Sequence, residues 1–234
     1  MKDRVILITG SSSGIGRAIT EIFLKDGATV IGIARSHDKF QPNTKRYKTF
    51  SVNVSDLNEL LDCLKKIISS HPNLNGLVSN AGYGHFEKLE NFSVRQIGDY
   101  ISTNLTSHLV VTRTILPHFK AQKRGDILFI GSEAALNGAK NGSLYCAAKF
   151  GVRGFSQAIR EECASTNVRV SLINPGMVRT PFFENLNFRP GDKQENAIEP
   201  NDVAIMARNI FAARAGTVFD EINMTPLKRV IKFD

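Results

Sequence analysis

The stretch RVILITGSSSGIG, residues 4–16, decides the fold that this chain can adopt. Its first part, Arg4–Thr9, is a β-branched run typical of a strand buried on both faces. Glycines stand at positions 10, 14 and 16, and Arg17–Lys25 then repeats apolar residues at helical spacing. Such glycines permit a tight turn and close approach of the backbone to a pyrophosphate at the positive end of the helix. The stretch therefore predicts a dinucleotide site, although a glycine-rich turn alone can also be an ordinary loop.

The residues after the second strand indicate which dinucleotide binds. Gly27–Ala34 reads as that strand and closes a β-α-β unit. An NAD site normally has Asp or Glu here for the ribose 2′-hydroxyl, whereas an NADP site has an Arg that accepts the 2′-phosphate. In this chain Arg35 and Ser36 follow the strand, and the first acid is Asp38. We therefore predict NADP(H), with Arg35 pairing with the phosphate and Ser36 assisting. The alternative is that Arg35 is a solvated surface residue.

The rest of the chain alternates predicted strands with predicted helices. Further strands are expected at Tyr47–Val52, Gly76–Ser79, Asp126–Gly131 and Thr217–Ile222, and helices after Ser55 or Asp56 and at about Ser93–Ala121, Tyr145–Ser165 and Asn201–Ala213. This order predicts a single α/β domain over residues 1–234, a Rossmann-like doubly wound parallel sheet with helices on both faces. Ligands of such sheets bind beyond the carboxyl ends of the strands, where the glycine turn, Asn80 and Ser132 fall.

The segment Gly131–Lys149 carries the residues for proton transfer. Ser132 ends an apolar, strand-like run, Tyr145 follows thirteen positions later and Lys149 four beyond that. Residues i and i+4 share a helix face, so Tyr145 and Lys149 can point together at the end of the strand. A free phenol titrates near ~10, and a nearby positive charge favours its ionised form. The pair suits protonation of a carbonyl oxygen, although Tyr and Lys at this spacing are usually surface neighbours.

Taken together, these motifs closely resemble those of the short-chain dehydrogenase/reductase family. The matching residues span almost the whole chain in the right order: Thr9-Gly10-x-x-x-Gly14-x-Gly16, Asn80-Ala81-Gly82, Asn104, Ser132, Tyr145-x-x-x-Lys149, Pro175-Gly176 and Thr180. The resemblance implies that Tyr145 is the general acid/base and that Ser132 holds the substrate carbonyl. It implies that Lys149 lowers the pKa of Tyr145 and binds the nicotinamide ribose. Asn104 would hold a water in a proton relay to Lys149.

The same resemblance implies a set of cofactor contacts. The expected NADP(H)-binding residues are Gly10, Ser12, Ser13, Gly14, Ile15, Gly16, Arg35, Ser36, Asn53, Val54, Asn80, Ala81, Gly82, Tyr145, Lys149, Pro175, Gly176, Val178 and Thr180, the last at the nicotinamide carboxamide. The chain has Asn53 where the family often has Asp beside the adenine, and an amide can still accept and donate hydrogen bonds. It has Ser79 before Asn80 where many members have two asparagines, which puts little in doubt.

Residues 179–200 are expected to form part of the substrate pocket. The resemblance gives this role to the region, and Phe182 and Phe183 would suit an apolar or aryl ketone. One interpretation is a mobile lid that excludes water. The other is a loop whose aromatic side chains pack on the body of the protein. The short basic tail that begins at Met224 is interpreted as a packing or interface segment rather than as a substrate contact.

Composition limits the classes of protein to which the chain can belong. Its 234 residues fit one domain, and 30 Lys and Arg against 22 Asp and Glu give a net charge of +8. This balance favours an anionic partner, but without a nucleic-acid-binding motif we expect no nucleic-acid partner. Because neither a membrane-spanning apolar stretch nor a signal peptide is present, we expect a cytoplasmic protein without membrane contact. The three cysteines lack metal-site spacing, so no metal is expected.

The leading functional hypothesis is an NADPH-dependent oxidoreductase that reduces a ketone or aldehyde to an alcohol. A 3-oxoacyl-thioester reductase is the alternative within the same chemistry. For it, Lys120, Lys123 and Arg124 are either a docking surface for an acyl carrier protein or a solvated helix end. An idle NADP(H)-binding sensor is the alternative from another class, disfavoured because it needs no catalytic residues. The family commonly pairs subunits through its two long helices, so a homodimer or homotetramer is expected.

Overall fold

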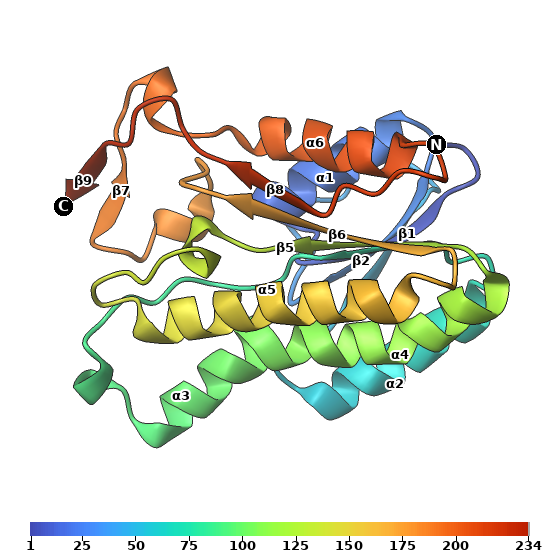
Figure 1. Cartoon of the computed structure of the whole chain (residues 1–234), viewed down its shortest axis with the longest axis horizontal. Helices are drawn as coiled ribbons and strands as arrows, with labels where there is room; N and C mark the ends of the chain where they lie inside the picture. Colours follow the sequence, from blue (N-terminus) through green and yellow to red (C-terminus); the bar gives the residue numbers. More distant parts are fainter. Residues whose placement is uncertain (234) are drawn as a thin grey trace.

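A computed structural model describes residues 1–233 and shows a seven-stranded parallel sheet between two layers of helices (Figure 1). The strand order is β3-β2-β1-β4-β5-β6-β8, so the order reverses between β1 and β4. The strands are β1 (Val5–Thr9), β2 (Thr29–Ala34), β3 (Tyr47–Ser51), β4 (Gly76–Ser79), β5 (Gly125–Ile130), β6 (Val168–Pro175) and β8 (Glu221–Met224). This is the predicted doubly wound Rossmann-like fold, and the reversal creates its ligand crevice at the ends of β1 and β4.

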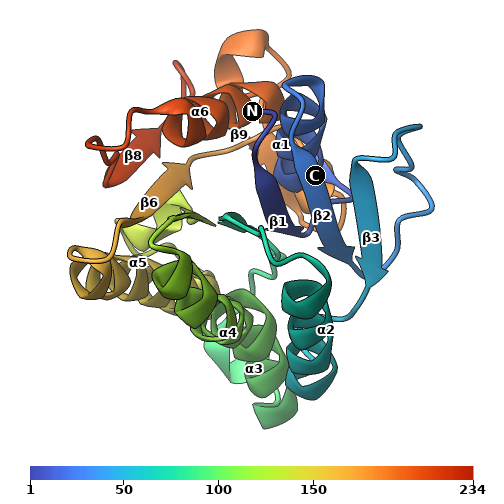
Figure 2. The ribbon, with the colours of Figure 1, turned by 90° about the vertical axis from the view of Figure 1, so that its right-hand side faces the viewer.

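Helices cover both faces of the sheet (Figure 2). One face carries α1 (Gly14–Lys25) and α6 (Pro200–Ala212), and the other carries α2 (Leu57–Ser70), α4 (Ser107–Gln122) and α5 (Ser143–Cys163). Alternate residues of β1 enter different cores. Val5 and Leu7 pack with α2, α4 and α5, whereas Ile6 and Ile8 pack with α1 and α6. The β-branched run is therefore buried on both faces, as predicted.

The connection between β2 and β3 is not helical, which corrects the prediction that strands and helices alternate throughout. Residues 35–46, all within the described part of the chain, cross between the two strands as turns and irregular backbone. The segment lacks apolar residues at helical spacing and contains Pro42, so it offers no helix face to the sheet. A parallel crossover needs about a dozen residues, which this loop supplies. Arg35 and Ser36 thus lie at the start of an irregular loop.

The long helix predicted over Ser93–Ala121 is interrupted near its middle. α3 (Val94–Ile101) begins with a capping box between Ser93 and Gln96. A π-helical turn, Ser102–Thr106, then joins α3 to α4, and this turn contains Asn104. Such turns are rare and occur frequently at functional sites. The interruption therefore falls on a residue for which the family resemblance implied a catalytic role.

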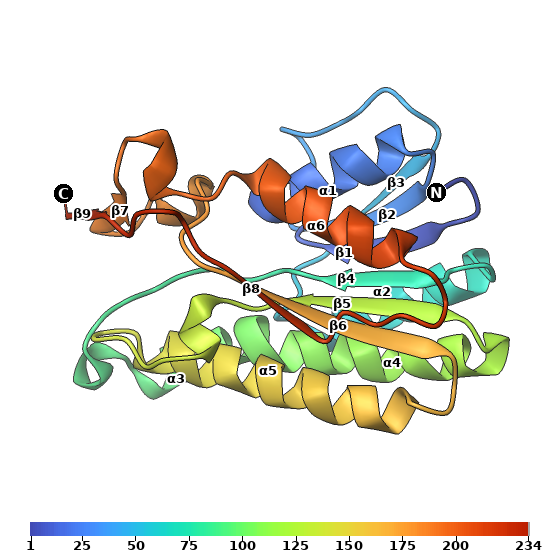
Figure 3. The same cartoon turned by 45° about the horizontal axis from the view of Figure 1, so that its top comes forward.

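The C-terminal part differs most from the prediction. The last strand of the main sheet is β8, a few residues beyond the predicted Thr217–Ile222. Residues 179–200 contain strand β7 (Phe188–Pro190), which pairs antiparallel with β9 (Ile231–Phe233) in the tail. Figures 1 and 3 show this small sheet beyond the end of the molecule toward which β6 and β8 point. The tail packs against the body as predicted, and does so through strand pairing.

A buried ion-pair cluster closes the opposite end of the sheet. Asp126, at the start of β5, pairs with Arg4 and, at 2.5 Å, with Arg169 on β6. All three side chains are at most 15% exposed. Arg169 also donates to backbone carbonyls, including that of Ala213 at 2.9 Å. Asp126 thus connects the N-terminus, two central strands and the segment after α6.

We expect Asp126→Ala to destabilise the protein by about 3–5 kcal/mol, because it leaves two largely buried arginines without their carboxylate. The measurement is urea unfolding followed by circular dichroism. Asp62→Ala is the matched control, since the Asp62–Lys65 pair is well exposed and such pairs contribute about 1 kcal/mol or less. Equal midpoints for the two variants would contradict the role given to the cluster.

Candidate active site

The glycine turn after β1 has a backbone that favours glycine and leaves no space for a side chain at Gly16. Gly10 and Gly14 have φ values of +69° and +50°, in the left-handed region. A Cβ on Gly16 would collide with the carbonyl oxygen of Gly10 and would lie 2.6 Å from the Asn80 amide nitrogen. The turn therefore presents bare backbone at the switch point of the sheet.

The N-terminus of α1 is open to an anion. Its N-cap residue, Ser13, is exposed and makes no side-chain capping bond within the described residues. The first turn of the helix holds no acidic residue. Free backbone N–H groups and the helix dipole favour a phosphate at such a terminus. The turn and helix thus fit a dinucleotide pyrophosphate, with Ser12, Ser13, Gly14 and Ile15 around it.

Arg35 is placed as the predicted phosphate-binding residue requires. It directly follows β2, is exposed, and makes no hydrogen bond or ion pair to another residue between 1 and 233. Ser36 is less available, because its hydroxyl donates a hydrogen bond of 2.7 Å to Asp38. A phosphate that bound Ser36 would have to replace this contact. An exposed Arg35 without a partner among residues 1–233 is available to a phosphate, but it equally fits a solvated surface residue, so its pairing with a 2′-phosphate stays a prediction.

A polar network beside the glycine turn was not predicted from the sequence. Tyr47 on β3 donates a hydrogen bond of 3.0 Å to Ser11 in the glycine turn, and its hydroxyl lies 3.2 Å from His37 Nδ1. Burial raises the pKa of Tyr47, so the phenol stays protonated as a donor. The network links the glycine turn to the irregular β2–β3 loop. Tyr47 is half-buried on a strand without regular alternation, so no sequence pattern indicates these partners.

Asn80 joins the ends of β1 and β4. Its side-chain amide donates to the carbonyls of Thr9 at 3.0 Å and Gly10 at 3.3 Å, and its N–H donates to the Thr9 hydroxyl at 3.0 Å. Ala81 donates to the same hydroxyl at 3.1 Å. Asn80 and Ala81 are therefore at the predicted edge, where they hold the glycine turn in place.

The adenine-side residues Asn53 and Val54 follow β3 at the same edge. Asn53 is exposed, and its side-chain oxygen accepts a hydrogen bond of 3.3 Å from Ser55. Val54 is buried in the core. Asn53 thus shapes the turn into α2, and its amide nitrogen is left as a donor toward solvent.

Ser132, Tyr145 and Lys149 come together, as predicted, at the carboxyl end of β5. All three are buried. Ser132 ends the strand and caps a short 3₁₀ helix by accepting a hydrogen bond of 3.2 Å from Ala134. Lys149 Nζ donates a bond of 3.1 Å to the carbonyl of Ile130 and lies 5.8 Å from the centre of the Tyr145 ring. The strand end and the first two turns of α5 thus build one proton-transfer unit.

Burial sets the protonation of this unit. It raises the pKa of Tyr145 to about 12, and a hydrogen bond with Ser132 opposes that increase. Burial lowers the pKa of Lys149 to about 8. For Tyr145, burial outweighs the hydrogen bond with Ser132, and the lowering of its pKa by Lys149 stays a prediction. At neutral pH the site therefore holds a protonated phenol beside an ammonium.

Asn104 uses its side chain to hold the neighbouring loop. Its Oδ1 accepts a hydrogen bond of 3.0 Å from the Tyr83 N–H, and its Nδ2 donates one of 3.2 Å to the Tyr100 carbonyl. A Cβ on Gly82 would lie 2.8 Å from Asn104 Oδ1, so the loop after β4 approaches very closely. These two bonds use one N–H and one lone pair of the amide, and the surrounding π-helical turn is where a relay water is expected.

His108 is a buried group beside this site that sequence reasoning missed. It lies one turn after Asn104, and its Nδ1 is 2.7 Å from the hydroxyl of Ser79. Its Nε2 has no hydrogen-bond partner among the described residues. Burial, with a smaller effect of the Lys149 charge, lowers the pKa of His108 to about 3. The imidazole is therefore neutral, and Ser79, which replaces an asparagine common in the family, is its partner.

The loop after β6 crosses over the glycine turn. Gly176 N–H donates a hydrogen bond of 2.8 Å to the Met224 carbonyl, and Val178 forms a β-bridge with Ile198. Thr180 accepts a bond of 3.3 Å from Phe182, and its side chain lies 3.3 Å from where a Cβ on Gly14 would be. The segment from Pro175 to Thr180 thus lies at the crevice, where the nicotinamide end of the cofactor was predicted.

Aromatic side chains cover Tyr145. Phe182 lies 5.8 Å from the tyrosine ring centre and 5.2 Å from Phe183. Phe86, which the sequence analysis did not single out, lies 5.2 Å from Tyr145. Phe188 contacts Phe86 at 5.0 Å and Phe183 at 5.9 Å. The predicted substrate residues Phe182 and Phe183 therefore lie close to Tyr145, within a larger cluster of aromatic rings.

Comparison with known proteins agrees with this geometry. The sequence model of the short chain dehydrogenase family matches residues 4–190, which include the glycine turn, Ser132, Tyr145 and Lys149. This chain belongs to that family. The short-chain dehydrogenase motifs thus describe the same residues that the structure brings together.

Relatives of this short-chain dehydrogenase are oxidoreductases. An uncharacterized oxidoreductase of Staphylococcus epidermidis is 30% identical over 200 residues, covering 83% of this chain and 86% of that protein. A 3-oxoacyl-acyl-carrier-protein reductase of Haemophilus influenzae is 33% identical over 206 residues, covering 86% and 83%. The solved structure of a metagenomic short-chain oxidoreductase in complex with NADP is 26% identical and superposes with a TM-score of 0.83 over 96% of this chain and 97% of that one.

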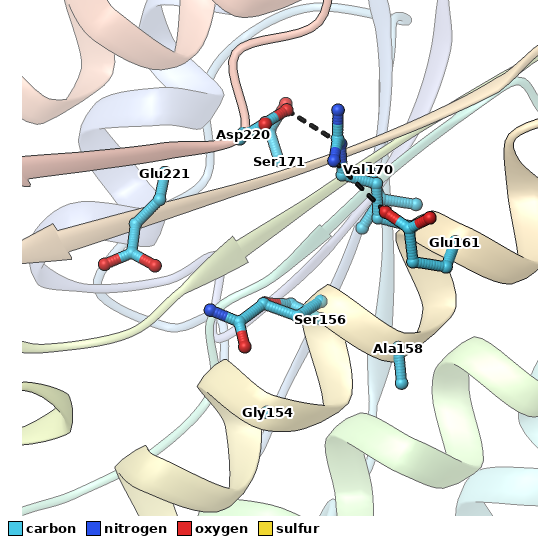
Figure 4. A pocket seen from close by; sticks show the side chains of 10 residues that line it. Gly154, Ser156, Ala158, Glu161, Val170, Ser171, Asp220 and Glu221 are labelled. Atoms are coloured by element: carbon cyan, nitrogen blue, oxygen red, sulfur yellow. Dashed lines mark hydrogen bonds and ion pairs between the residues drawn. The ribbon is translucent and has the colours of Figure 1, made fainter.

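A surface hollow of about 500 Å³ in this short-chain dehydrogenase lies elsewhere, between α5, β6 and β8 (Figure 4). Its lining includes Gly154, Ala158 and Ser171, and none of the predicted site residues. Arg160 pairs there with Asp220 at 2.7 Å and with Glu161 at 3.3 Å, as the dashed lines show. Its charged groups pair with one another or with neighbouring residues, and it is separate from the predicted site around Tyr145.

Among residues 1–233, no helix combines the length and hydropathy that crossing a membrane requires. Within the same residues, no three His, Cys, Asp or Glu side chains come close enough together to hold a metal ion.

We expect His108 to make the protein less stable in acid. Its pKa is about 3 when folded and near 6.5 when unfolded, so below pH 6.5 only the unfolded chain takes up this proton. Stability should fall by about 2 kcal/mol between pH 7 and pH 5 through this group. Urea unfolding at several pH values should show a flatter pH dependence for His108→Leu, whatever its absolute stability. Parallel curves for the two proteins would contradict this assignment.

Proposed function

We propose that this short-chain dehydrogenase is an NADPH-dependent reductase that converts a ketone or aldehyde into an alcohol. The observation that carries the proposal is the buried Ser132–Tyr145–Lys149 unit beside a glycine turn that fits a dinucleotide. NADPH, when bound, supplies the hydride. The glycine turn, the N-terminus of α1 and Arg35 would hold its phosphates, and Lys149 its nicotinamide ribose.

The side chains then handle the charge that develops on the substrate oxygen. Ser132 and Tyr145 donate hydrogen bonds to that oxygen, and such preorganised donors stabilise a growing negative charge. Tyr145, which is protonated at neutral pH, passes its proton to the oxygen. The ammonium of Lys149 beside the resulting phenolate stabilises it and can return a proton through a water held at the π-helical turn. The aromatic cover keeps bulk water from the reacting atoms.

A second candidate is reduction of a 3-oxoacyl thioester. Its support is the relationship to 3-oxoacyl-acyl-carrier-protein reductases such as that of Haemophilus influenzae. Lys120, Lys123 and Arg124, at the end of α4, are the basic residues that we suggested for docking a carrier. They precede the amino end of β5, whereas Ser132 follows its carboxyl end. A carrier docked on these basic residues would lie far from Ser132, so their position favours a free carbonyl compound as the substrate.

We expect Tyr145→Phe to lower kcat by about 10²–10⁴-fold, because the general acid is lost while the ring packing is kept. The measurement is NADPH oxidation against aryl ketones, diketones, aldehydes and a 3-oxoacyl thioester. Tyr83→Phe is the matched control. It removes a tyrosine hydroxyl from the loop after β4 but keeps the hydrogen bond from the Tyr83 N–H to Asn104. Native-like turnover by Tyr145→Phe would refute the mechanism, and NADPH binding without any turnover would favour the sensor.

We expect Arg35→Leu to weaken NADPH binding about 10- to 100-fold, since it removes a charge-assisted contact to the 2′-phosphate. NADH binding should change little. Arg95→Leu removes one positive charge from exposed α3 and controls for net charge. Fluorescence titration gives both affinities, and a native preference for NADH, or equal losses for both cofactors, would count against NADP(H).

Cytoplasmic localisation and subunit pairing remain predictions. The helices that would form the subunit interface are α4 and α5, which lie on one face of the sheet (Figure 2). Sedimentation of the purified protein would show whether a dimer or tetramer forms.

A further inference from the structure

The C-terminal strap, defined as residues 225–233, runs along the mouth of the proposed active site. It leaves β8 beside the nicotinamide loop, where Pro226 lies 3.2 Å from the position of a Cβ on Gly176. Arg229 lies 3.7 Å from Glu133, the residue next to Ser132. The strap ends in β9, paired with β7 (Figure 3). It therefore borders the site over its whole length.

Ionic and backbone contacts attach the strap to residues 188–196. Lys228 N–H donates to the Glu195 carbonyl at 2.9 Å, and its ammonium pairs with the Glu195 carboxylate at 2.8 Å. Gly191 N–H donates to the Val230 carbonyl at 2.9 Å. Asp192 pairs with Lys232 on the strap and with Arg189 on β7, and these two hydrogen bonds lower the pKa of its carboxyl to about 2. The strap and the substrate region thus form one unit.

The outer part of the strap belongs to a row of aromatic rings that reaches the catalytic tyrosine. Ring centres are 5.2 Å apart for Tyr145 and Phe86, 5.0 Å for Phe86 and Phe188, and 6.5 Å for Phe188 and Phe233. The four rings come from four separate segments. Phe233 is 75% exposed, so the row opens toward solvent at its outer end.

Phe188 depends on the strap for its position. It lies on β7, a strand of three residues whose only strand partner in the described chain is β9. Two short strands by themselves are marginally stable, so the ion pairs and rings are needed to keep them together. Removing β9 would free β7, and with it the ring that packs on Phe86.

We propose that the C-terminal strap determines substrate specificity by holding this aromatic wall for a carbonyl compound with an aryl group. Aromatic rings favour ring partners in offset or edge-to-face contact, each worth roughly a two- to tenfold gain in affinity. A substrate ring that packed against the side of this wall, next to Tyr145, would gain such contacts and present its carbonyl to Ser132. The inference rests on the proposed reductase function and adds the substrate class and the segment that selects it.

The test measures binding and turnover separately. Acetophenone is titrated into the full-length protein saturated with NADP⁺, followed by saturation-transfer NMR, and its reduction by NADPH is measured alongside. The variants are Phe233→Ala, which removes the outer ring, and Lys232→Pro, which removes the N–H of the residue opposite Arg189. Leu227→Ala is the matched control, because Leu227 is an exposed apolar residue of the same strap that lies outside the ring row.

We expect acetophenone to bind about fivefold more weakly to Phe233→Ala and at least tenfold more weakly to Lys232→Pro. Leu227→Ala should match the native protein, and NADP⁺ affinity should be the same in all four. Equal acetophenone affinity in every variant, or no binding to the native protein, would overturn the proposal. Loss of NADP⁺ binding in Phe233→Ala would also overturn it, since the strap would then support the whole fold.

The acetophenone binding measurement tests this proposal separately from the reductase function. Strap-dependent binding of acetophenone without turnover of any carbonyl compound would leave the strap's role standing and refute the proposed reductase. Turnover of aliphatic carbonyls with strap-independent acetophenone binding would support the reductase and overturn the strap's role.

Discussion

The packing of Asn80 against the glycine turn is the contact on which the rest of the site depends. The side-chain amide of Asn80 donates hydrogen bonds to the carbonyls of Thr9 and Gly10. A side chain on Gly16 would collide with both the Gly10 carbonyl and the Asn80 amide. This packing fixes the ends of β1 and β4 at the point where the strand order reverses. Because β5 pairs with β4, this contact also determines where β5 ends and Ser132 follows it.

Burial determines the protonation states of Lys149, Tyr145 and His108. Lys149 is almost completely buried, and loss of hydration disfavours its charged form, so its pKa falls to about 8. The same environment keeps Tyr145 protonated, which is the state that a proton donor for carbonyl reduction needs. His108 extends this dry region behind the site without adding charge. Such perturbed groups in one place are typical of a catalytic centre.

Sequence patterns predicted the parts of this protein that depend on local rules. The parallel sheet and the positions of Ser132, Tyr145 and Lys149 follow from periodicity and motif spacing, and the structure confirms that they come together. The helix-free β2–β3 loop and the π-helical turn at Asn104 were missed, since both replace regular structure where residue propensities are weak. His108 and Phe86 were missed because an isolated buried His or a loop Phe carries no spacing signal.

The aromatic wall was the hardest feature to predict, and the reason is physical. Its rings come from four segments far apart in the chain, and each pair of neighbouring segments is joined by a single ring contact. No periodicity records such an arrangement, and strands of three residues are too short to show alternation. The residues that move protons are constrained by the sheet, whereas the wall depends on the pairing of β7 with β9. A family with one reaction can therefore change its substrates by altering the end of the chain while the catalytic unit stays as it is.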